Sequence, residues 1–264
     1  MVRGRVAFCA LTALFTMVSE VRAETAYAVD SRALLLTFDT ELPAFVTDIK
    51  LIRGLQPGEG IMGIDFRPAN KRLYGLGSSS RLYVIDTETG QATAVGTAPF
   101  SPALDGTEFG FDFNPTVDRI RVTSNRGQNL RLHPDTGVVA ATDGALAYDD
   151  GMAPGVAASA YTNNFVGATT TVLYNLDATR GLLVTQNPPN DGKLNLVGTL
   201  VGLNASQVAG FDISGNTGRA FAAVRLANSN KCMFYEIHLP TGDYNPLGTI
   251  SIFEQISGLA IAPR

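Results

Sequence analysis

The chain has few of the residues that build transition-metal sites and covalent catalytic sites. Its 264 residues include two cysteines, two histidines and no tryptophan. Zinc and copper sites need clusters of Cys and His, and Ser-His-Asp or Cys-His catalysis needs a histidine beside its nucleophile. His133 and His238 both precede a Thr-Gly pair, in the place that Asp39, Asp86 and Asp177 take elsewhere. This shared place predicts that they stabilise turns, so these classes of site are not expected.

Long apolar runs are also lacking, except at the N-terminus. Arg3 and Arg5 precede an apolar run over residues 6–18, and Val21-Arg22-Ala23 follows with small residues where a signal peptidase cleaves. The run is too short for a stable membrane span and is typical of a secretory signal peptide. We therefore expect residues 1–23 to be a signal peptide, residues 24–264 to form one domain, and the protein to be periplasmic or secreted, with no membrane span in the mature chain.

Positive charge and cysteine are scarce in the expected mature chain. Removal of residues 1–23 takes away three arginines and one glutamate, which leaves 17 basic and 23 acidic residues. A net negative charge disfavours nucleic acid and anionic membranes as partners. Cys232 is then the one remaining cysteine, so an intramolecular disulfide is excluded and the fold depends on packing. We expect a monomer.

Short runs of alternating apolar and small or polar residues fill most of the chain. The clearest series is Gly63-Ile64-Asp65-Phe66, then residues 72–76, 81–90 and 92–97, each bounded by Gly, Asn, Asp or Pro. Alternation with such breaks is the signature of antiparallel strands joined by tight turns. With 27 glycines and 17% charged residues, the composition also favours strands over helices.

This series of four runs recurs along the chain. The first run of each repeat begins at residues 63, 110, 155, 210 and 258. The resulting period of about 45–55 residues is that of four-stranded propeller blades. The N-terminal repeat, residues 26–51, lacks a first run, whereas the chain ends on a first run, residues 258–262, with no others after it. The sequence thus predicts an all-β fold, a five-bladed β-propeller whose ring is closed when the C-terminal strand joins the N-terminal blade.

The fourth repeat is the most altered. We assign its four runs to residues 155–158, 164–168, 172–177 and 194–199. Residues 188–192 are then an insertion between the third and fourth runs, and residues 226–231 decorate the fifth repeat in a similar way. Loops of this kind on a rigid scaffold are common places for binding specificity.

Three first runs carry an aspartate in the same position: Asp65, Asp112 and Asp212. The equivalent positions in the fourth and closing runs are expected at Ala157 and Ala260. First strands line the central channel of a propeller, so the three carboxylates should converge near its axis, where mutual repulsion would raise a pKa or recruit a cation. Three alternatives stay open: hydrogen bonds to backbone amides of the adjacent blade, binding of a metal or ligand, and catalysis.

A second candidate lies in residues 118–131, which are dense in arginine and amide side chains. Arg121 and Arg131 stand where Tyr74 and Tyr83 stand in the second repeat, and Asn125 and Asn129 lie between them in the sequence. Two arginines on neighbouring strands can grip a carboxylate. The structural alternative is an inter-blade ion pair with Asp112 or Asp118. We take Arg121, Asn125, Asn129 and Arg131 with the three aspartates as the candidate ligand-binding residues, and we assign no catalytic residue and no metal ligand.

No cofactor is expected from the sequence, and the ion that its acidic residues would suit is calcium. The loop from Asp143 to Gly151 is acidic, but it lacks the alternating spacing of a calcium-binding loop. A solvated loop is the simpler interpretation.

Several motifs together resemble a known family. They are Gly-Ile-Asp-Phe-Arg-Pro at 63–68, the thirteen residues at 110–122, Gly-Gln-Asn-Leu-Arg-Leu-His-Pro-Asp-Thr-Gly at 127–137, and Ala-Tyr-Thr-Asn-Asn at 160–164. With these the chain resembles the bacterial family called domain of unknown function 4394, over nearly all of its expected mature length. The resemblance implies an exported, propeller-like domain. It brings no established activity and no catalytic residues.

We therefore expect a non-catalytic module that binds a small polar ligand or a protein, or that acts as a scaffold. A first alternative is a hydrolase acting on glycans, with Asp65, Asp112 and Asp212 as acid, base and modulator. A second alternative is a structural protein of the cell envelope. The lack of tryptophan, which is prominent in sugar-binding clefts, counts against the glycan hydrolase.

Overall fold

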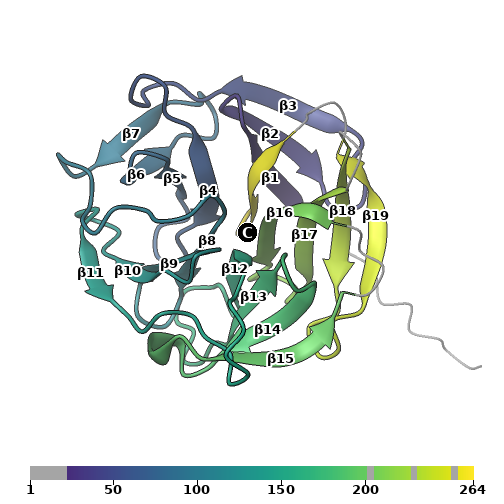
Figure 1. Ribbon diagram of the computed structural model, residues 1–264. Coiled ribbons are helices and arrows are strands. Elements are labelled where there is room, and N and C mark those ends of the chain that lie inside the picture. Colours follow the sequence, from purple (N-terminus) through teal and green to yellow (C-terminus); the bar gives the residue numbers. More distant parts are fainter. Residues whose placement is uncertain (1–22, 201–204, 227–230, 251–254) are drawn as a thin grey trace, which may run out of the picture.

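The computed structural model describes residues 23–200, 205–226, 231–250 and 255–264, which form five antiparallel sheets of four strands each. Figure 1 shows the sheets arranged radially around a central axis, with the C-terminus close to that axis. The fold is therefore a five-bladed β-propeller, as predicted. Residues 1–22 of the expected signal peptide lie outside the described residues. In the part of the chain that the structure describes, no helix is long and apolar enough to cross a membrane.

Each blade contributes one inner strand, two middle strands and one outer strand. From the inside outward, the first blade has β20 (Ile256–Ile261), β1 (Thr25–Asp30), β2 (Leu34–Asp39) and β3 (Val46–Leu51). The second has β4 (Ile61–Phe66), β5 (Leu73–Gly77), β6 (Arg81–Ile85) and β7 (Ala92–Val95). The third has β8 (Phe109–Asn114), β9 (Arg119–Ser124), β10 (Asn129–Leu132) and β11 (Val139–Thr142).

The last two blades follow the same order. The fourth has β12 (Val156–Tyr161), β13 (Leu173–Asp177), β14 (Leu182–Gln186) and β15 (Leu194–Thr199), with the short 3-10 helix η1 (Pro189–Asp191) before β15. The fifth has β16 (Ala205–Ile213), β17 (Ala220–Leu226), β18 (Cys232–Ile237) and β19 (Tyr244–Ile250).

Burial along the strands follows from this radial arrangement. Every residue of the inner strand β12 is buried, whereas the residues of the outer strands β3, β7 and β11 are exposed or partly buried, apart from the buried Ala92 in β7. An inner strand is covered on both faces by the adjacent blades, so it consists mostly of apolar and small residues, with the repeated aspartate as an exception. An outer strand has one edge in solvent, which is why its polar residues are tolerated.

The inner strands contact one another in a closed cycle, β4 with β8, then β12, β16 and β20, and back to β4. Closure is made by the C-terminal strand, because β20 pairs with β1 in a register that sets Ala26 opposite Ile261 and Val29 opposite Gly258. The predicted closure by the two ends of the chain is thus confirmed. It supplies the first blade with its inner strand, so that β1 is paired on both of its edges.

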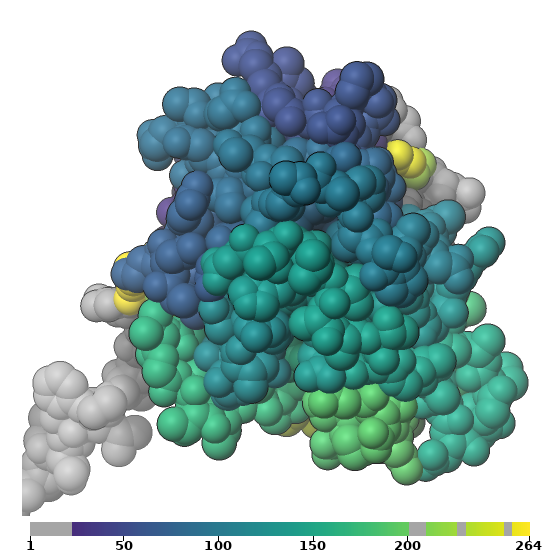
Figure 2. Space-filling model, turned by 90° about the vertical axis from the view of Figure 1, so that its left-hand side faces the viewer, coloured from purple at the N-terminus to yellow at the C-terminus, as the bar shows by residue number. Residues whose placement is uncertain are grey.

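Apolar cores lie between adjacent blades. Phe38 of the first blade meets Phe234 of the fifth edge to face, with ring centroids 5.3 Å apart, and Tyr74 of the second meets Phe113 of the third at 5.1 Å. Figure 2 shows the second and third blades, in blue and teal, in close contact on the outside of the ring. A single blade cannot cover both faces of its sheet, so the radial stack supplies the burial that stabilises each blade.

Tight turns join the third and outer strands, as predicted from the Thr-Gly pairs. In the turn after β10, the Asp135 backbone N–H donates to His133 Nδ1 at 3.2 Å, and Gly137 adopts a φ of 70°. A Cβ atom on Gly137 would lie 2.5 Å from the Val95 carbonyl oxygen of the preceding blade. Glycine therefore allows both the turn and its close approach to β7. His238 also contacts its own turn, with Nδ1 2.9 Å from Thr241 Oγ1.

The run assignment in the fourth blade was wrong. Residues 164–168 lie in the loop that joins β12 to β13, and the run ending at Asp177 is the second strand of the blade, β13. The third strand is β14, so Asp177 does not share the turn position of His133. The insertion at residues 188–192 is present between β14 and β15. Most of the other insertion, residues 227–230, lies outside the described residues.

Candidate functional site

Asp65, Asp112 and Asp212 converge as predicted. Each stands one residue before the end of its repeat's Gly-x-Asp-x run, on the inner strands β4, β8 and β16, and each is at most 2% exposed. One carboxylate oxygen of each lies within 4.8 Å of the others. We call this set the axial carboxylate cluster.

Each member of the cluster binds the backbone of the following blade. Asp65 Oδ2 accepts from the Phe113 N–H at 2.8 Å, and Asp112 Oδ1 accepts from the Tyr161 N–H at 3.0 Å. Asp212 Oδ2 accepts from the Ile261 N–H at 2.5 Å. The expected hydrogen bonds to adjacent blades are thus present, and they join blade two to three, three to four, and five to one.

These hydrogen bonds correct the register of the fourth blade. The backbone N–H that donates to the aspartate always belongs to the residue after the repeated aspartate position, as Phe113 follows Asp112 and Ile261 follows Ala260. In the fourth blade that amide belongs to Tyr161, so Ala160, and not Ala157, takes the aspartate position. The assignment of Ala157 was three residues off because Ala158 replaces the glycine that marks this run elsewhere.

Burial controls the electrostatics of the cluster. It raises the pKa of Asp65 well above its ordinary value, and the nearby Asp212 carboxylate raises it further. Burial likewise raises the pKa of Asp112, with added repulsion from the other two carboxylates, and raises the pKa of Asp212 to about 6. The backbone hydrogen bonds lower the pKa of each group but do not cancel desolvation. Three buried carboxylates this close cannot all ionise without a countercharge.

A cavity of about 300 Å³ opens at the other end of the channel, where the inner strands begin. We call it the mouth cavity. It is lined by Ser31, Gly60, Ile61, Met62, Thr107, Glu108, Phe109, Ala157, Gln255, Ile256 and Ser257. Below it the channel narrows, and the free volume between residues such as Phe111, Phe211 and Leu259 is about 10 Å³. This volume holds at most a single water molecule. The axial carboxylate cluster is therefore separated from the mouth cavity by an apolar constriction.

Glu108 is the one ionisable side chain among the described residues that line the mouth cavity. Its side chain is partly buried, and burial raises the pKa of its carboxyl group. Within the described parts of the chain no hydrogen bond or ion pair reaches this carboxylate. Glu108 was not among the predicted site residues, and the signal for it in the sequence is an acidic residue immediately before the apolar Phe109 at the start of an inner strand.

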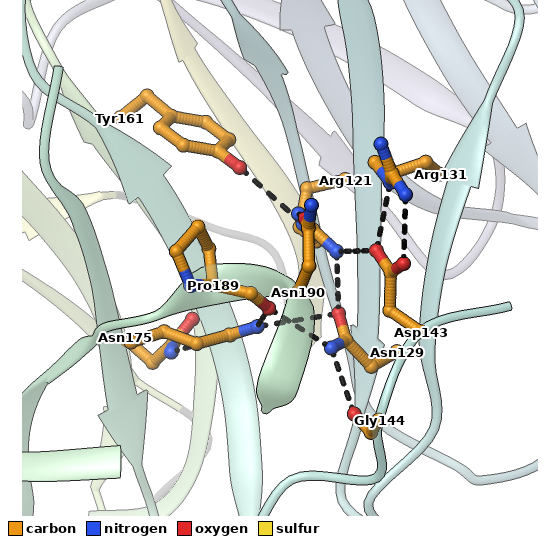
Figure 3. Close-up of polar contacts among 10 residues, drawn as sticks. Arg121, Asn129, Arg131, Asp143, Gly144, Tyr161, Asn175, Pro189 and Asn190 are labelled. Atoms are coloured by element: carbon orange, nitrogen blue, oxygen red, sulfur yellow. Dashed lines mark hydrogen bonds and ion pairs between the residues drawn. The ribbon is translucent and has the colours of Figure 1, made fainter. Parts of the chain in front are cut away.

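The second candidate site forms a closed network, shown in Figure 3. Arg121 is 2% exposed, and its Nη1 donates to Asp143 Oδ2 at 2.6 Å and to Asn129 Oδ1 at 2.8 Å. Its Nη2 donates to Asn190 Oδ1 at 2.8 Å, and its Nε to the Tyr161 hydroxyl at 3.3 Å. The guanidinium is fully engaged by the third and fourth blades. It serves as a tie between them rather than as an open anion site.

Arg131 joins Arg121 on the same acid. Its Nε and Nη2 donate to the two oxygens of Asp143 at 2.8 Å each. Both arginines thus bind one carboxylate, as expected, and this carboxylate belongs to the same chain. The expected partners were wrong: neither Asp112 nor Asp118 pairs with Arg121, and Asp118 instead binds Arg67 of the second blade.

Two details of this stretch also differ from the expectation. Arg131 lies opposite Arg121 in the sheet as Val84 lies opposite Tyr74, so Val84, and not Tyr83, takes its place in the second blade. Asn125 lies apart from the network, where its Oδ1 accepts from the Thr107 N–H at 3.0 Å and its Nδ2 donates to the Thr107 hydroxyl at 2.9 Å. Asn129 is part of the network, since its Nδ2 donates to the Gly144 and Pro189 carbonyls.

The acidic loop over residues 143–151 directs its carboxylates to basic side chains. Asp143 binds the two arginines, Asp149 lies 2.9 Å from Lys193 Nζ, and Asp150 lies 2.8 Å from Arg180 Nη2. The described side chains of this loop therefore do not gather around a common point as calcium ligands would.

Known structures share the fold at low sequence identity. A protein of unknown function from Bacteroides thetaiotaomicron VPI-5482 has a TM-score of 0.53 and 13% identity, over 87% of this chain and 59% of that chain. The chain thus spans 59% of the length of that protein. The glutaminyl cyclase of Myxococcus xanthus has a TM-score of 0.54 and 11% identity, over 87% of this chain and 97% of that chain. Such likeness concerns the fold alone.

No curated protein matches the chain. The sequence profile of the family described as Domain of unknown function (DUF4394) matches residues 34–260, which include the second to fifth blades and all of the first blade except β1 and the last residue of β20. This match covers most of the chain and agrees with the resemblance of the motifs at 63–68 and 110–137. The chain belongs to the DUF4394 family.

Proposed function

We propose that this protein is an exported, non-catalytic binding module whose mouth cavity holds a small ligand with a cationic group beside an apolar one. The observation that carries the proposal is Glu108, a partly buried carboxylate without a described partner in a cavity of about 300 Å³. That volume is at the lower end of the usual range of small-molecule sites. Export is supported by the basic and then apolar residues at the N-terminus.

The lining of the mouth cavity matches such a ligand. Met62, Phe109 and Ile256 offer apolar surface, and Ser31 and Thr107 add polar side chains to the lining. A cation that pairs with Glu108 would recover the free energy that burial costs this carboxylate. A neutral ligand of the same shape would gain only the apolar contacts.

Catalysis by the axial carboxylates receives less support. A glycan hydrolase needs two acids in a cleft open to substrate, whereas Asp65, Asp112 and Asp212 are at most 2% exposed. The apolar constriction separates them from the mouth cavity. A solute in the mouth cavity would therefore not touch them.

The test compares two probes of equal shape, phenethylamine and its neutral counterpart 2-phenylethanol, by isothermal titration calorimetry at neutral pH. We expect the amine to bind at least about tenfold more tightly, since a charge-assisted bond in a partly buried site is worth about 1.5–3 kcal/mol. Glu108→Gln should abolish this preference, and Glu88→Gln, which removes an exposed acid elsewhere, should not. Equal affinity of the wild type for both probes, or none for either, would contradict the proposal.

A further inference from the structure

Three acidic side chains lie buried together on the axis without a basic partner. Among the described residues, no Lys, Arg or His forms an ion pair with Asp65, Asp112 or Asp212. Burial of uncompensated negative charge is costly, and it is normally balanced by a cation or by protons. The hydrogen bonds to the next blades use N–H donors, which stabilise the carboxylates but bring no positive charge.

A fourth polar group lies over the cluster. Asn164, in the loop between β12 and β13, is 9% exposed, and its amide lies within hydrogen-bonding reach of the Asp65 carboxylate. Its Oδ1 is buried and has no hydrogen-bond partner in the described structure. A buried amide oxygen without a donor is uncommon and points to a missing partner of positive character.

The position of Asn164 is fixed by the backbone. A Cβ atom on Gly215, in the β16–β17 turn of the fifth blade, would lie 2.0 Å from the Asn164 carbonyl oxygen, so the loop and the turn are in direct contact. Asn164 belongs to the fourth blade, and Asp65, which it reaches, belongs to the second. The two blades are not neighbours in the ring. The Asn164 side chain therefore reaches the cluster at the axis, at the end of the channel opposite the mouth cavity.

The spacing of the oxygens suits calcium. Calcium binds oxygen ligands at about 2.3–2.6 Å, so two ligands on opposite sides of the ion lie about 4.6–5.2 Å apart. One oxygen from each of the three aspartates lies within 4.8 Å of the others. Carboxylate and amide oxygens are also the ligand types that calcium prefers. Magnesium demands near-ideal octahedral geometry and usually keeps several waters, which suits a buried cluster of protein oxygens less.

We propose that Asp65, Asp112 and Asp212 bind one calcium ion on the axis of the propeller, and that the Asn164 amide group turns its oxygen toward this ion. The ion joins side chains of the second, third, fourth and fifth blades at one point. Its role is structural, because the surrounding side chains and the apolar constriction keep it away from solutes in the mouth cavity. The site is separate from the ligand proposed to pair with Glu108.

The first measurement is the metal content and thermal stability of the purified protein. The protein is first treated with EGTA, and calcium is then added back to one part of it at about 2 mM, a concentration that saturates the calcium sites of extracellular modules. We expect one calcium ion per chain by mass spectrometry after gel filtration in the sample with calcium added back, and a melting temperature several degrees above that of the EGTA sample. Magnesium at the same concentration should give a smaller shift. A wild type without bound calcium and with equal melting temperatures in all samples would overturn the proposal.

Substitutions of the proposed ligands test where the calcium ion binds. Asp112→Asn keeps an oxygen that can accept from the Tyr161 N–H but removes one charge, so it should weaken calcium binding at least about tenfold. Asn164→Ala should weaken it less, and both variants should lose most of the calcium-dependent shift. Asp149→Asn, in the acidic loop, is the matched control and should behave as the wild type does. If Asp112→Asn retained the full calcium content and shift, or if Asp149→Asn lost them, the ion would lie elsewhere and the assignment would be wrong.

Discussion

The Asp65 carboxylate of the second blade accepts a hydrogen bond from the Phe113 N–H of the third blade, 2.8 Å away. Asp112 and Asp212 repeat this relationship toward Tyr161 and Ile261. The contact joins two inner strands that share no ladder hydrogen bonds, because each inner strand pairs only with the second strand of its own blade. The aspartates therefore provide hydrogen bonds between the inner strands of adjacent blades, which the sheets themselves do not provide.

The first prediction concerns these hydrogen bonds between blades. Asp112→Ala leaves the buried Tyr161 N–H without a partner and should lower the free energy of unfolding by about 1–3 kcal/mol. Asp112→Asn retains an acceptor and should cost less. Urea unfolding of both variants in EGTA measures the hydrogen bond with the axis free of calcium. An alanine variant as stable as the asparagine variant would show that the bond contributes nothing.

The second prediction concerns Arg121. Arg121→Met removes the guanidinium that Asp143, Asn129 and Asn190 share, and leaves a buried acid with fewer donors. Loss of one partner of a buried ion pair costs about 3–5 kcal/mol, so a clear drop in the urea midpoint is expected.

Arg126→Met is the matched control for this measurement. Arg126 pairs with Asp105 at 3.2 Å, but the two side chains are 68% and 62% exposed. Exposed ion pairs contribute little, so this variant should unfold almost as the wild type does. Similar destabilisation by both substitutions would contradict a structural role for the buried network.

The third prediction concerns ring closure. Removal of residues 256–264 deletes β20, which exposes the edge of β1 and the inner faces of its neighbours. The truncated protein should aggregate or elute as large oligomers in gel filtration. A shorter truncation that removes only Pro263 and Arg264 leaves β20 intact and should stay monomeric. A folded monomer without residues 256–264 would refute closure as the source of stability.

The fourth prediction concerns Cys232. Its side chain is 1% exposed on β18, and burial raises the pKa of its thiol to about 12. Because the thiolate is the reactive form, Cys232 should resist iodoacetamide at pH 8 for as long as the protein is folded. Peptide mass spectrometry should find it alkylated only after addition of denaturant. Rapid alkylation without denaturant would mean that the β18 region opens locally.

Much of the fold could be predicted from the sequence, because the repeat keeps its spacing. The prediction failed in the fourth blade, where Ala158 and Ala160 replace the glycine and aspartate that mark the inner strand elsewhere. Gly155 stands three residues earlier and imitates the missing marker. Periodicity alone cannot show whether Gly155 or Ala158 takes the marker position, whereas the hydrogen bond from the Tyr161 N–H to Asp112 can.

The candidate site was predicted unevenly for a similar reason. Convergence of the three aspartates follows from equal positions in repeats around a ring. Two of the partners of Arg121, Asp143 and Asn190, come from connections between strands, 22 and 69 residues further along the chain. Nothing in a repeat specifies where such loops turn. Glu108 escaped notice because it precedes the inner-strand motif and has no counterpart among the other repeats.

The last prediction concerns the pH dependence of amine binding in the mouth cavity. Burial raises the pKa of Glu108 above the ordinary value of 4.5, so its negative charge is lost at a higher pH than that of an exposed glutamate. The other described residues that line the cavity do not titrate. Of the nearby charged groups, Glu59 accepts hydrogen bonds from the hydroxyls of Ser79 and Tyr83, and Arg32 forms an ion pair with Asp30.

Phenethylamine remains protonated throughout this range, because alkylammonium groups have a pKa of about 10. Its affinity, measured by calorimetry from pH 8 downward, should therefore fall as the pH passes through the raised pKa of Glu108, with a midpoint above 4.5. The neutral alcohol should show no such fall, and Glu108→Gln should bind the amine weakly at every pH. A fall that persists in Glu108→Gln would assign the titration to another group, and the cation would then have to be placed outside the mouth cavity.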